Sequence, residues 1–251
     1  MYLIGEGGIG KTTALFSIME DTYKDTLYSV CQDKKTIVPL FIELSKAPAD
    51  YCAVYEDAKS TFIHRYLFML ISSFDEKHLI SENPHEMAKI MQERDSRAVD
   101  RMNILFENET DNVQYLLLLD GLNEVSRKQL SDSENDFIGT PAELIIDEIQ
   151  ELLRYKNISV VITSRADEAL NDMEDEFERF YLTGVSEDAI KEYLLQHYIS
   201  FEEVRENARL METLKIPLFL KMYSKLDVTS EVSTPGEILY AFFSERSAKY
   251  T

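Results

Sequence analysis

The chain has 251 residues, of which 45% are hydrophobic and 29% charged, as in a folded globular protein long enough for one large α/β domain and a smaller lobe. Its formal net charge of −20 argues against non-specific binding to nucleic acid, because contacts to phosphates need an excess of lysine and arginine. Apolar stretches run only about five residues, against the roughly 20 that a membrane helix needs. The two cysteines, Cys31 and Cys52, lack the spacing of a disulfide framework or a zinc site, so we expect a cytoplasmic protein.

The first elements are a short strand, a glycine-rich loop and a helix. Tyr2–Ile4 has the pattern of a strand, and the helix after the loop runs from Lys11 to about Met19. Because only Met1–Ile4 precede the loop, we expect the sequence to be a module of a longer chain. The next apolar run, Ile37–Glu43, predicts a second strand, and Pro39 within it favours a position near a sheet edge.

The middle of the chain alternates helices with buried strands. Two helices are expected first, and their apolar residues are Phe62, Tyr66, Leu67 and Leu70 in one and Met87, Ile90, Met91, Met102 and Leu105 in the other. Strands are then predicted at Tyr115–Leu119, Ile158–Thr163 and Phe180–Leu182. Between the first two, Thr140, Pro141 and Glu143 have the pattern of a capping box that starts a helix. This alternation predicts a parallel sheet with right-handed crossovers.

The last quarter of the chain predicts helices alone. A helix begins at Ser186, a second spans roughly 201–214, the segment Ile216–Leu218 interrupts the chain, and Thr234–Glu237 is a second capping box. We therefore expect two domains, with residues 1–184 forming the sheet domain and residues 185–251 forming a small helical lobe.

The loop between the first strand and the first helix has the pattern G-x-x-x-x-G-K-[ST] of a phosphate-binding loop, in the residues Gly5-Glu6-Gly7-Gly8-Ile9-Gly10-Lys11-Thr12. Glycines let backbone N–H groups converge on an anion, and the helix N-terminus adds a partial positive charge. Lys11 would reach the β- and γ-phosphates, the Thr12 hydroxyl would ligate Mg²⁺, and Thr13 could contact the α-phosphate. The alternative is a glycine-rich turn that binds nothing.

Two carboxylates follow the strand at Tyr115–Leu119. Asp120 ends that buried strand, where it can hold Mg²⁺ through the water shell of the ion, although a turn residue is the alternative. Glu124 lies four residues further on and can orient and deprotonate an attacking water, although a solvated loop glutamate is the alternative.

The strand at Ile158–Thr163 also ends in polar residues. Arg165 could bind the γ-phosphate through its guanidinium and report its presence, and a surface salt bridge is the alternative. Ser224–Asp227 has some likeness to the guanine-reading motif of GTPases, but no strand precedes it. The four histidines have no metal-ligand spacing.

These motifs together resemble those of NACHT domains, the nucleotide-binding modules of STAND-class signalling proteins. The resemblance lies in the phosphate loop, in the segment Leu116–Glu124, and in the strand end Val160–Arg165. Gly121 after the aspartate, followed by an acidic cluster, separates NACHT domains from their NB-ARC relatives. The compact core resembles bacterial NLR-like proteins of antiviral defence more than animal receptors.

The resemblance implies a fold and a set of roles. The fold is a three-layer α/β P-loop NTPase with a five-stranded parallel sheet of order 5-1-4-3-2 and a C-terminal helical lobe. The nucleotide is ATP or ADP with Mg²⁺. The implied roles are phosphate binding by Gly10, Lys11, Thr12 and Thr13, Mg²⁺ coordination through Asp120, help with hydrolysis by Glu124, phosphate sensing by Arg165 and closure over the nucleotide by Pro217.

The chain departs from the NACHT pattern at Asn123, where relatives usually carry aspartate, and this places catalysis on Glu124 and predicts slow hydrolysis. Ala166 stands where proline is common in relatives. The resemblance further implies a switch that self-associates with ATP bound and is joined to effector and sensor domains. Two other interpretations stay open, namely a scaffold that binds nucleotide without hydrolysing it, and a metabolic kinase or GTPase.

Overall fold

The computed structural model describes residues 1–30, 36–47, 62–64, 66–67, 102–104, 106–107, 113–128, 130–131, 137–165, 177–226 and 232–248. The chain divides into two compact units. The first comprises Met1–Leu3 and Thr12–Arg179, and the second comprises Ile4–Lys11 and Phe180–Thr251. The loop before the first helix is therefore grouped with the C-terminal helices, and the chain passes between the two units after Leu3, Lys11 and Arg179. The domain boundary expected after residue 184 stays a prediction.

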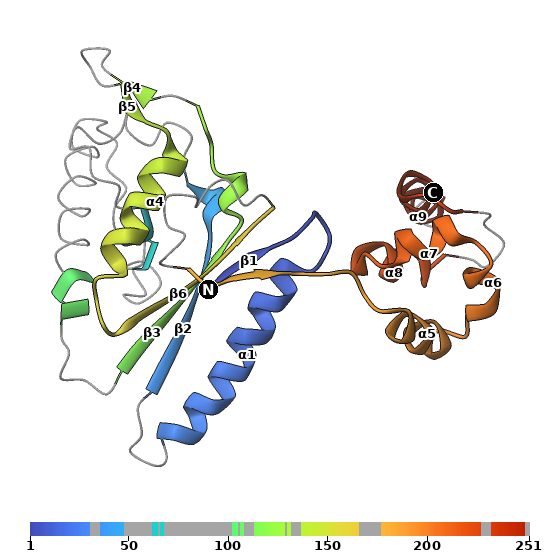
Figure 1. Ribbon diagram of the computed structural model, residues 1–251, viewed down its shortest axis with the longest axis horizontal. Coiled ribbons are helices and arrows are strands. Elements are labelled where there is room, and N and C mark those ends of the chain that lie inside the picture. The colour runs from blue at the N-terminus through green and yellow to red at the C-terminus, as the bar shows by residue number, and fades with distance from the viewer. Residues whose placement is uncertain are drawn as a thin grey trace. The chain divides into compact units, whose positions relative to one another are not determined.

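A five-stranded parallel sheet has the order β2-β3-β6-β1-β7 (Figure 1). Its strands are β1 (Tyr2–Ile4), β2 (Thr36–Glu43), β3 (Val113–Asp120), β6 (Ile158–Ser164) and β7 (Arg179–Tyr181). Counted along the chain, this is the order 5-1-4-3-2, so the predicted sheet is confirmed. The prediction from Pro39 is also confirmed, because β2 lies at an edge of the sheet, where a missing backbone N–H is tolerated.

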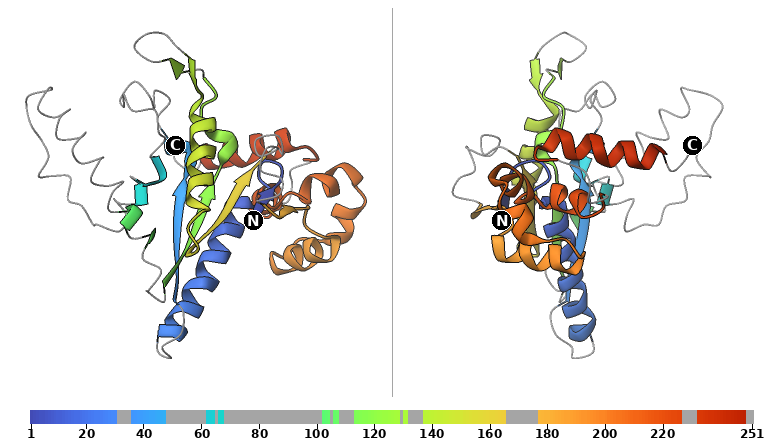
Figure 2. Two further views of the ribbon diagram at one scale, coloured as in Figure 1. Left: turned by 60° about the vertical axis from the view of Figure 1, so that its left-hand side comes forward. Right: turned by 90° about the vertical axis from the view of Figure 1, so that its right-hand side faces the viewer.

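Helices cover both faces of the sheet, with α1 (Lys11–Val30) on one side and α4 (Pro141–Leu152) on the other (Figures 1 and 2). Leu15 of α1 is buried against Leu3, Leu118 and Val161, which come from three neighbouring strands. The helix α1 is longer than the sequence predicted, since it continues past Met19, and the ion pair of Glu20 with Lys24 at 2.8 Å supports its exposed side.

The start of α4 has the predicted capping box. The hydroxyl of Thr140 accepts from the backbone N–H of Glu143 at 3.3 Å, and the carboxylate of Glu143 accepts from the backbone N–H of Thr140 at 2.7 Å. Pro141 occupies the first turn, where its missing N–H leaves no donor unpaired.

Other parts of the first unit differ from the prediction or lie outside the description. An antiparallel pair, β4 (Leu130–Ser131) with β5 (Phe137–Gly139), was not predicted. Residues 62–64, 66–67, 102–104 and 106–107 are helical, in the two regions where helices were expected. The remaining residues on which those helices were predicted, Leu70, Met87, Ile90, Met91 and Leu105, lie outside the described residues.

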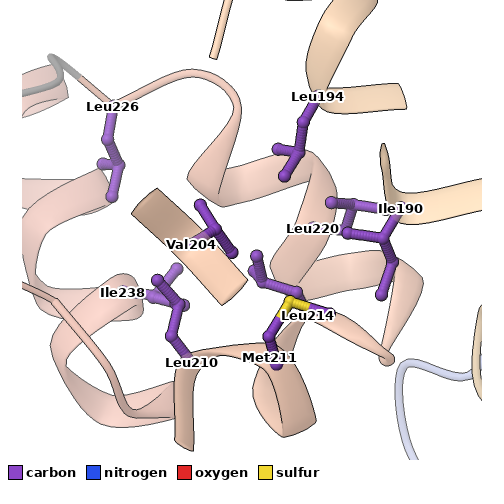
Figure 3. Packing of buried hydrophobic residues seen from close by; sticks show 9 residues of the cluster. All are labelled: Ile190, Leu194, Val204, Leu210, Met211, Leu214, Leu220, Leu226 and Ile238. Carbon is purple, nitrogen blue, oxygen red and sulfur yellow. The ribbon is translucent and has the colours of Figure 1, made fainter. Parts of the chain in front are cut away.

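The second unit carries five helices in the described part of its C-terminal segment. They are α5 (Glu187–Gln196), α6 (Phe201–Arg205), α7 (Ala208–Leu214), α8 (Pro217–Tyr223) and α9 (Pro235–Ala248). Figure 3 shows their shared core of nine buried residues, Ile190, Leu194, Val204, Leu210, Met211, Leu214, Leu220, Leu226 and Ile238.

The single helix predicted over 201–214 is wrong. The chain ends α6 at Arg205 and starts α7 at Ala208, because the side chain of Asn207 accepts from the backbone N–H of Leu210 at 3.1 Å and so caps a new helix. The second predicted capping box is confirmed, with Glu237 accepting from the backbone N–H of Thr234 at 3.0 Å. Among the described residues, no helix has the length and apolar character that crossing a membrane requires.

A buried carboxylate joins α4 to the helical residues 62–64. Glu148 is 1% exposed, and its oxygens accept from the backbone N–H groups of Ile63 and His64, each at 3.0 Å. The same carboxylate lies 2.5 Å from Nδ1 of His64, which is itself buried. A carboxylate in the interior is stable only when hydrogen-bond donors surround it, so this cluster fixes the position of Ile63 and His64 against α4.

We expect Glu148→Ala to lower the free energy of unfolding by about 3 kcal/mol, because it leaves buried N–H groups of Ile63 and His64 without their acceptor. Urea denaturation followed by circular dichroism measures the change. The neighbouring exposed residue provides the control, and Asp147→Ala should change the same free energy by less than about 0.5 kcal/mol. Equal effects of the two substitutions would contradict the role given to Glu148.

A second prediction concerns the end of α5. Tyr198 has a φ of 61° and is 97% exposed, while the backbone N–H groups of Tyr198 and Ile199 donate to the carbonyls of Leu195 and Leu194 at 3.1 and 3.0 Å. This is a Schellman motif, in which glycine is favoured at the left-handed position.

Tyr198→Gly should therefore raise the free energy of unfolding by about 1 kcal/mol, since it relieves the strain and removes a side chain that buries almost nothing. Tyr198→Ala, which keeps a Cβ at the strained position, should stay close to the wild type in the same urea denaturation. A gain of equal size in both variants would show that backbone strain is not the cause.

Candidate functional site

Strand register brings three polar side chains together at the carboxyl end of the sheet. Leu118 of β3 pairs with Val161 of β6, and both pack against Leu15 of α1. Because side chains alternate between faces along a strand, the residues two positions further on, Asp120 and Thr163, lie on that same face. Thr12 lies in the first turn of α1, just before Leu15.

Both oxygens of the Asp120 carboxylate accept hydrogen bonds from hydroxyl groups. Thr12 Oγ1 donates to Oδ2 at 2.7 Å, and Thr163 Oγ1 donates to Oδ1 at 2.6 Å. The Thr163 oxygen also accepts from the backbone N–H of Gly121 at 2.9 Å, and the Thr163 side chain is fully buried. These contacts fix the carboxylate in one orientation.

The turn after Asp120 folds back so that the side chain of Glu124 lies close to Gly121. Gly121 has a φ of 82°, and the residues Leu122–Glu124 form a short 3₁₀ helix that the backbone N–H of Glu124 closes onto the carbonyl of Gly121 at 2.8 Å. A Cβ on residue 121 would lie 3.2 Å from the Glu124 carboxylate, so glycine is needed here for its backbone angle and for space. Leu122 and Val125, both buried, anchor the two ends of the turn.

Asn123 lies in the same turn and contacts the end of β6. Its Oδ1 accepts from the backbone N–H of Arg165 at 2.9 Å. The residue Arg165, predicted to sense phosphate, is exposed just after the strand, while Ala166 lies outside the described residues. The structure thus brings Arg165 to the turn that carries Glu124.

Glu43 is a further carboxylate at this edge of the sheet, which the sequence analysis did not single out. It ends β2 in register with Asp120. Its Oε2 lies 3.0 Å from Nζ of Lys46, and this hydrogen bond raises the pKa of the lysine. The ion pair is exposed, and it compensates one negative charge beside Asp120.

Residues Gly5–Lys11 of the phosphate loop lie in the second unit. Nζ of Lys11 donates to the carbonyl oxygens of Gly5 at 2.6 Å and Glu6 at 2.9 Å, and the backbone N–H of Ile9 donates to the Glu6 carbonyl at 3.4 Å. Gly10 has a φ of 103°, and no heavy atom of the described residues lies within 4 Å of the place that a Cβ on it would take. Gly7 and Thr13 are exposed. The backbone at Gly10 is therefore open to a ligand.

Gly8 packs against the segment that carries Pro217. A Cβ on Gly8, whose φ is 81°, would lie 3.2 Å from Cγ2 of Ile216 and equally close to Leu218. Pro217, between these two residues, is the first residue of α8. The structure therefore joins the loop to the start of α8, two parts that lie far apart in the sequence.

Mg²⁺ fits the donors that this arrangement provides. Magnesium takes oxygen ligands and is usually bound in proteins through one or two carboxylates together with phosphate oxygens. The oxygens of Thr12 and Asp120 are such donors, and they lie 2.7 Å apart. The hydrogen bond from Thr163 to Oδ1 holds the Asp120 carboxylate so that its other oxygen faces Thr12. A cation bound by both residues would need this orientation.

Two solved structures resemble this chain. One is PCH-2 of C. elegans, at 15% sequence identity and a TM-score of 0.41, with 100% of this chain and 61% of that chain covered. The other is Cdc6p of Pyrobaculum aerophilum, at 16% identity and a TM-score of 0.43, with 99% of this chain and 54% of that chain covered. The chain thus spans less than two thirds of the length of either protein. No curated protein matches the sequence.

The sequence profile described as NACHT domain matches residues 1–201, which is most of the chain. The five-stranded parallel sheet and the strand–loop–helix arrangement at Gly5–Thr12 agree with that match. The chain belongs to the NACHT family of nucleotide-binding P-loop NTPase domains.

Proposed function

We propose that this domain binds ATP with Mg²⁺, hydrolyses it slowly, and uses the bound nucleotide to control self-association in cytoplasmic signalling or antiviral defence. In this proposal it is one module of a longer chain that carries effector and sensor domains. The observation that carries the proposal is the carboxylate of Asp120, held by Thr12 and Thr163 next to the turn that presents Glu124.

Each residue has a role in the proposed reaction. The backbone of Gly5–Gly10 and the ammonium of Lys11 bind the phosphates, with Thr13 at the α-phosphate. Thr12 and Asp120 hold Mg²⁺, which when bound neutralises charge on the β- and γ-phosphates. Glu124 orients the attacking water and accepts its proton, and Arg165 binds the γ-phosphate.

The packing of Gly8 against Ile216 and Leu218 supports a link between nucleotide and helical lobe. Any shift of the loop on phosphate binding has to be accommodated by these two side chains, and Pro217 lies between them. A switch of this kind needs different nucleotide affinities in its two arrangements. In the proposal, Lys11, Arg165 and Pro217 supply that difference.

A scaffold that binds ATP without hydrolysing it is the second candidate. Asn123 is the observation that favours it, since an amide cannot accept a proton from water as the aspartate of related domains can. Glu124 remains as a base in this site, so measuring ATP hydrolysis in the wild type and in a Glu124 variant separates the two candidates.

The first test concerns binding. Lys11→Ala removes the only side-chain cation of the loop and should weaken ATP–Mg²⁺ binding by roughly 10- to 100-fold, the range expected when a charged hydrogen bond to phosphate is lost. Isothermal titration calorimetry measures the affinity. Lys24→Ala, on the exposed side of the same helix, removes an equal charge and should leave the affinity within about twofold. Unchanged binding in Lys11→Ala would exclude the proposed phosphate site.

The second test concerns hydrolysis. Glu124→Gln keeps the size of the side chain and removes the base, so phosphate release should fall by at least about 100-fold while ATP binding is retained. The control Glu192→Gln, at an exposed position of α5, should release phosphate at the wild-type rate. Equal turnover in Glu124→Gln and the wild type would remove Glu124 from the mechanism.

The outcomes also separate the alternatives. Binding without any turnover in the wild type would favour the scaffold. A larger rise in melting temperature with GTP than with ATP would favour a GTPase, because the ligand that binds the folded state more tightly gives more stabilisation.

A further inference from the structure

Asn123 lies in the turn after β3, and its side chain has a defined partner in this structure. Oδ1 of Asn123 accepts from the backbone N–H of Arg165 at 2.9 Å. A backbone N–H needs an acceptor, and an amide oxygen serves this purpose as a carboxylate oxygen does. Asparagine and aspartate at this position could therefore both accept this hydrogen bond.

Two such bonds connect the end of β6 with the turn after β3. The backbone pairing of the strands runs to Leu119 with Ile162. Beyond it, the hydroxyl of Thr163 accepts from the backbone N–H of Gly121, and Oδ1 of Asn123 accepts from that of Arg165. In the first bond the side chain comes from the strand, and in the second it comes from the turn. The two segments are thus held to each other in both directions.

Both neighbours of Asn123 in the turn have defined contacts. Asn123 lies between Leu122, which is buried, and Glu124, whose backbone N–H closes the 3₁₀ helix on Gly121 at 2.8 Å. The hydrogen bond from Arg165 to Asn123 therefore connects the backbone at the end of β6 with the turn that carries Glu124.

We propose that Asn123 is a positioning residue, which ties the backbone of Arg165 to the turn that carries Glu124 so that phosphate sensing and water activation are set together. This inference rests on the proposed function, since it takes Arg165 as the phosphate sensor and Glu124 as the base. It assigns to Asn123 no contact with nucleotide.

The experiment is a double-mutant cycle on the ATP and ADP affinities, measured by calorimetry with Mg²⁺. Asn123→Ala should reduce the preference for ATP over ADP by roughly 3- to 10-fold, the effect of one lost hydrogen bond. Asn123→Asp keeps the acceptor and should retain the preference. If the asparagine acts through the arginine, the double mutant Asn123→Ala with Arg165→Ala should have the same preference for ATP over ADP as Arg165→Ala alone. Arg154→Ala, at an exposed position, is the control for the lost guanidinium.

Amide hydrogen exchange at Arg165 in the protein without nucleotide tests the contact by itself. It should be faster in Asn123→Ala than in the wild type, and unchanged in Asn123→Asp. Unchanged exchange in Asn123→Ala would overturn the inference, and so would additive losses in the double mutant.

The test also distinguishes failure of the inference from failure of the proposed function. If Arg165→Ala keeps the full ATP preference while Lys11→Ala abolishes binding, Arg165 is not the sensor and the inference falls with that role, while the phosphate loop stands. If Lys11→Ala binds like the wild type, the proposed nucleotide site itself fails.

Discussion

The pairing of Leu118 with Val161 sets the positions of Asp120 and Thr163 at the carboxyl edge of the sheet. It directs these two side chains onto Leu15 of α1, and the alternation of the strands then directs Asp120 and Thr163 toward the start of that helix. A shift of one residue would turn both polar side chains to the other face of the sheet. The apolar core beneath the site thus determines its geometry as much as the polar residues themselves.

The loop and the helical lobe form a second connected system. Gly8 lies against Ile216 and Leu218, and the lobe behind them is fixed by its own apolar core. The chain passes from this system to the first unit between Lys11 and Thr12. Adjacent residues of one motif, the lysine proposed to bind phosphate and the threonine proposed to bind magnesium, therefore belong to different units.

Local spacing predicted the loop and both capping boxes, whereas the order of the strands in the sheet was implied by the resemblance to NACHT domains and not by any local signal. The sequence missed the contacts that depend on register or on distant segments. The sequence did not single out Thr163, because many strands end in a polar residue. Its position two residues after Val161, on the same face of the strand, could have predicted its contact with Asp120. The acceptor role of Asn123 and the burial of Glu148 against His64 had no such signal, because both partners lie far away in the chain. Asn207 was a local signal for the start of a new helix, but the apolar periodicity over residues 201–214 favoured a single helix.

The contact of Gly8 with Ile216 and Leu218 has a consequence for how such chains diverge. A larger residue at position 216 or 218 would press on the loop, and a side chain at position 8 would press on the helix. Substitutions at position 8 and at positions 216 and 218 therefore depend on one another. Across homologues, we expect the size of the residues at positions 216 and 218 to co-vary with the size of the residue at position 8. Selection on the phosphate motif would then also restrict which residues the helical lobe can carry at these two positions.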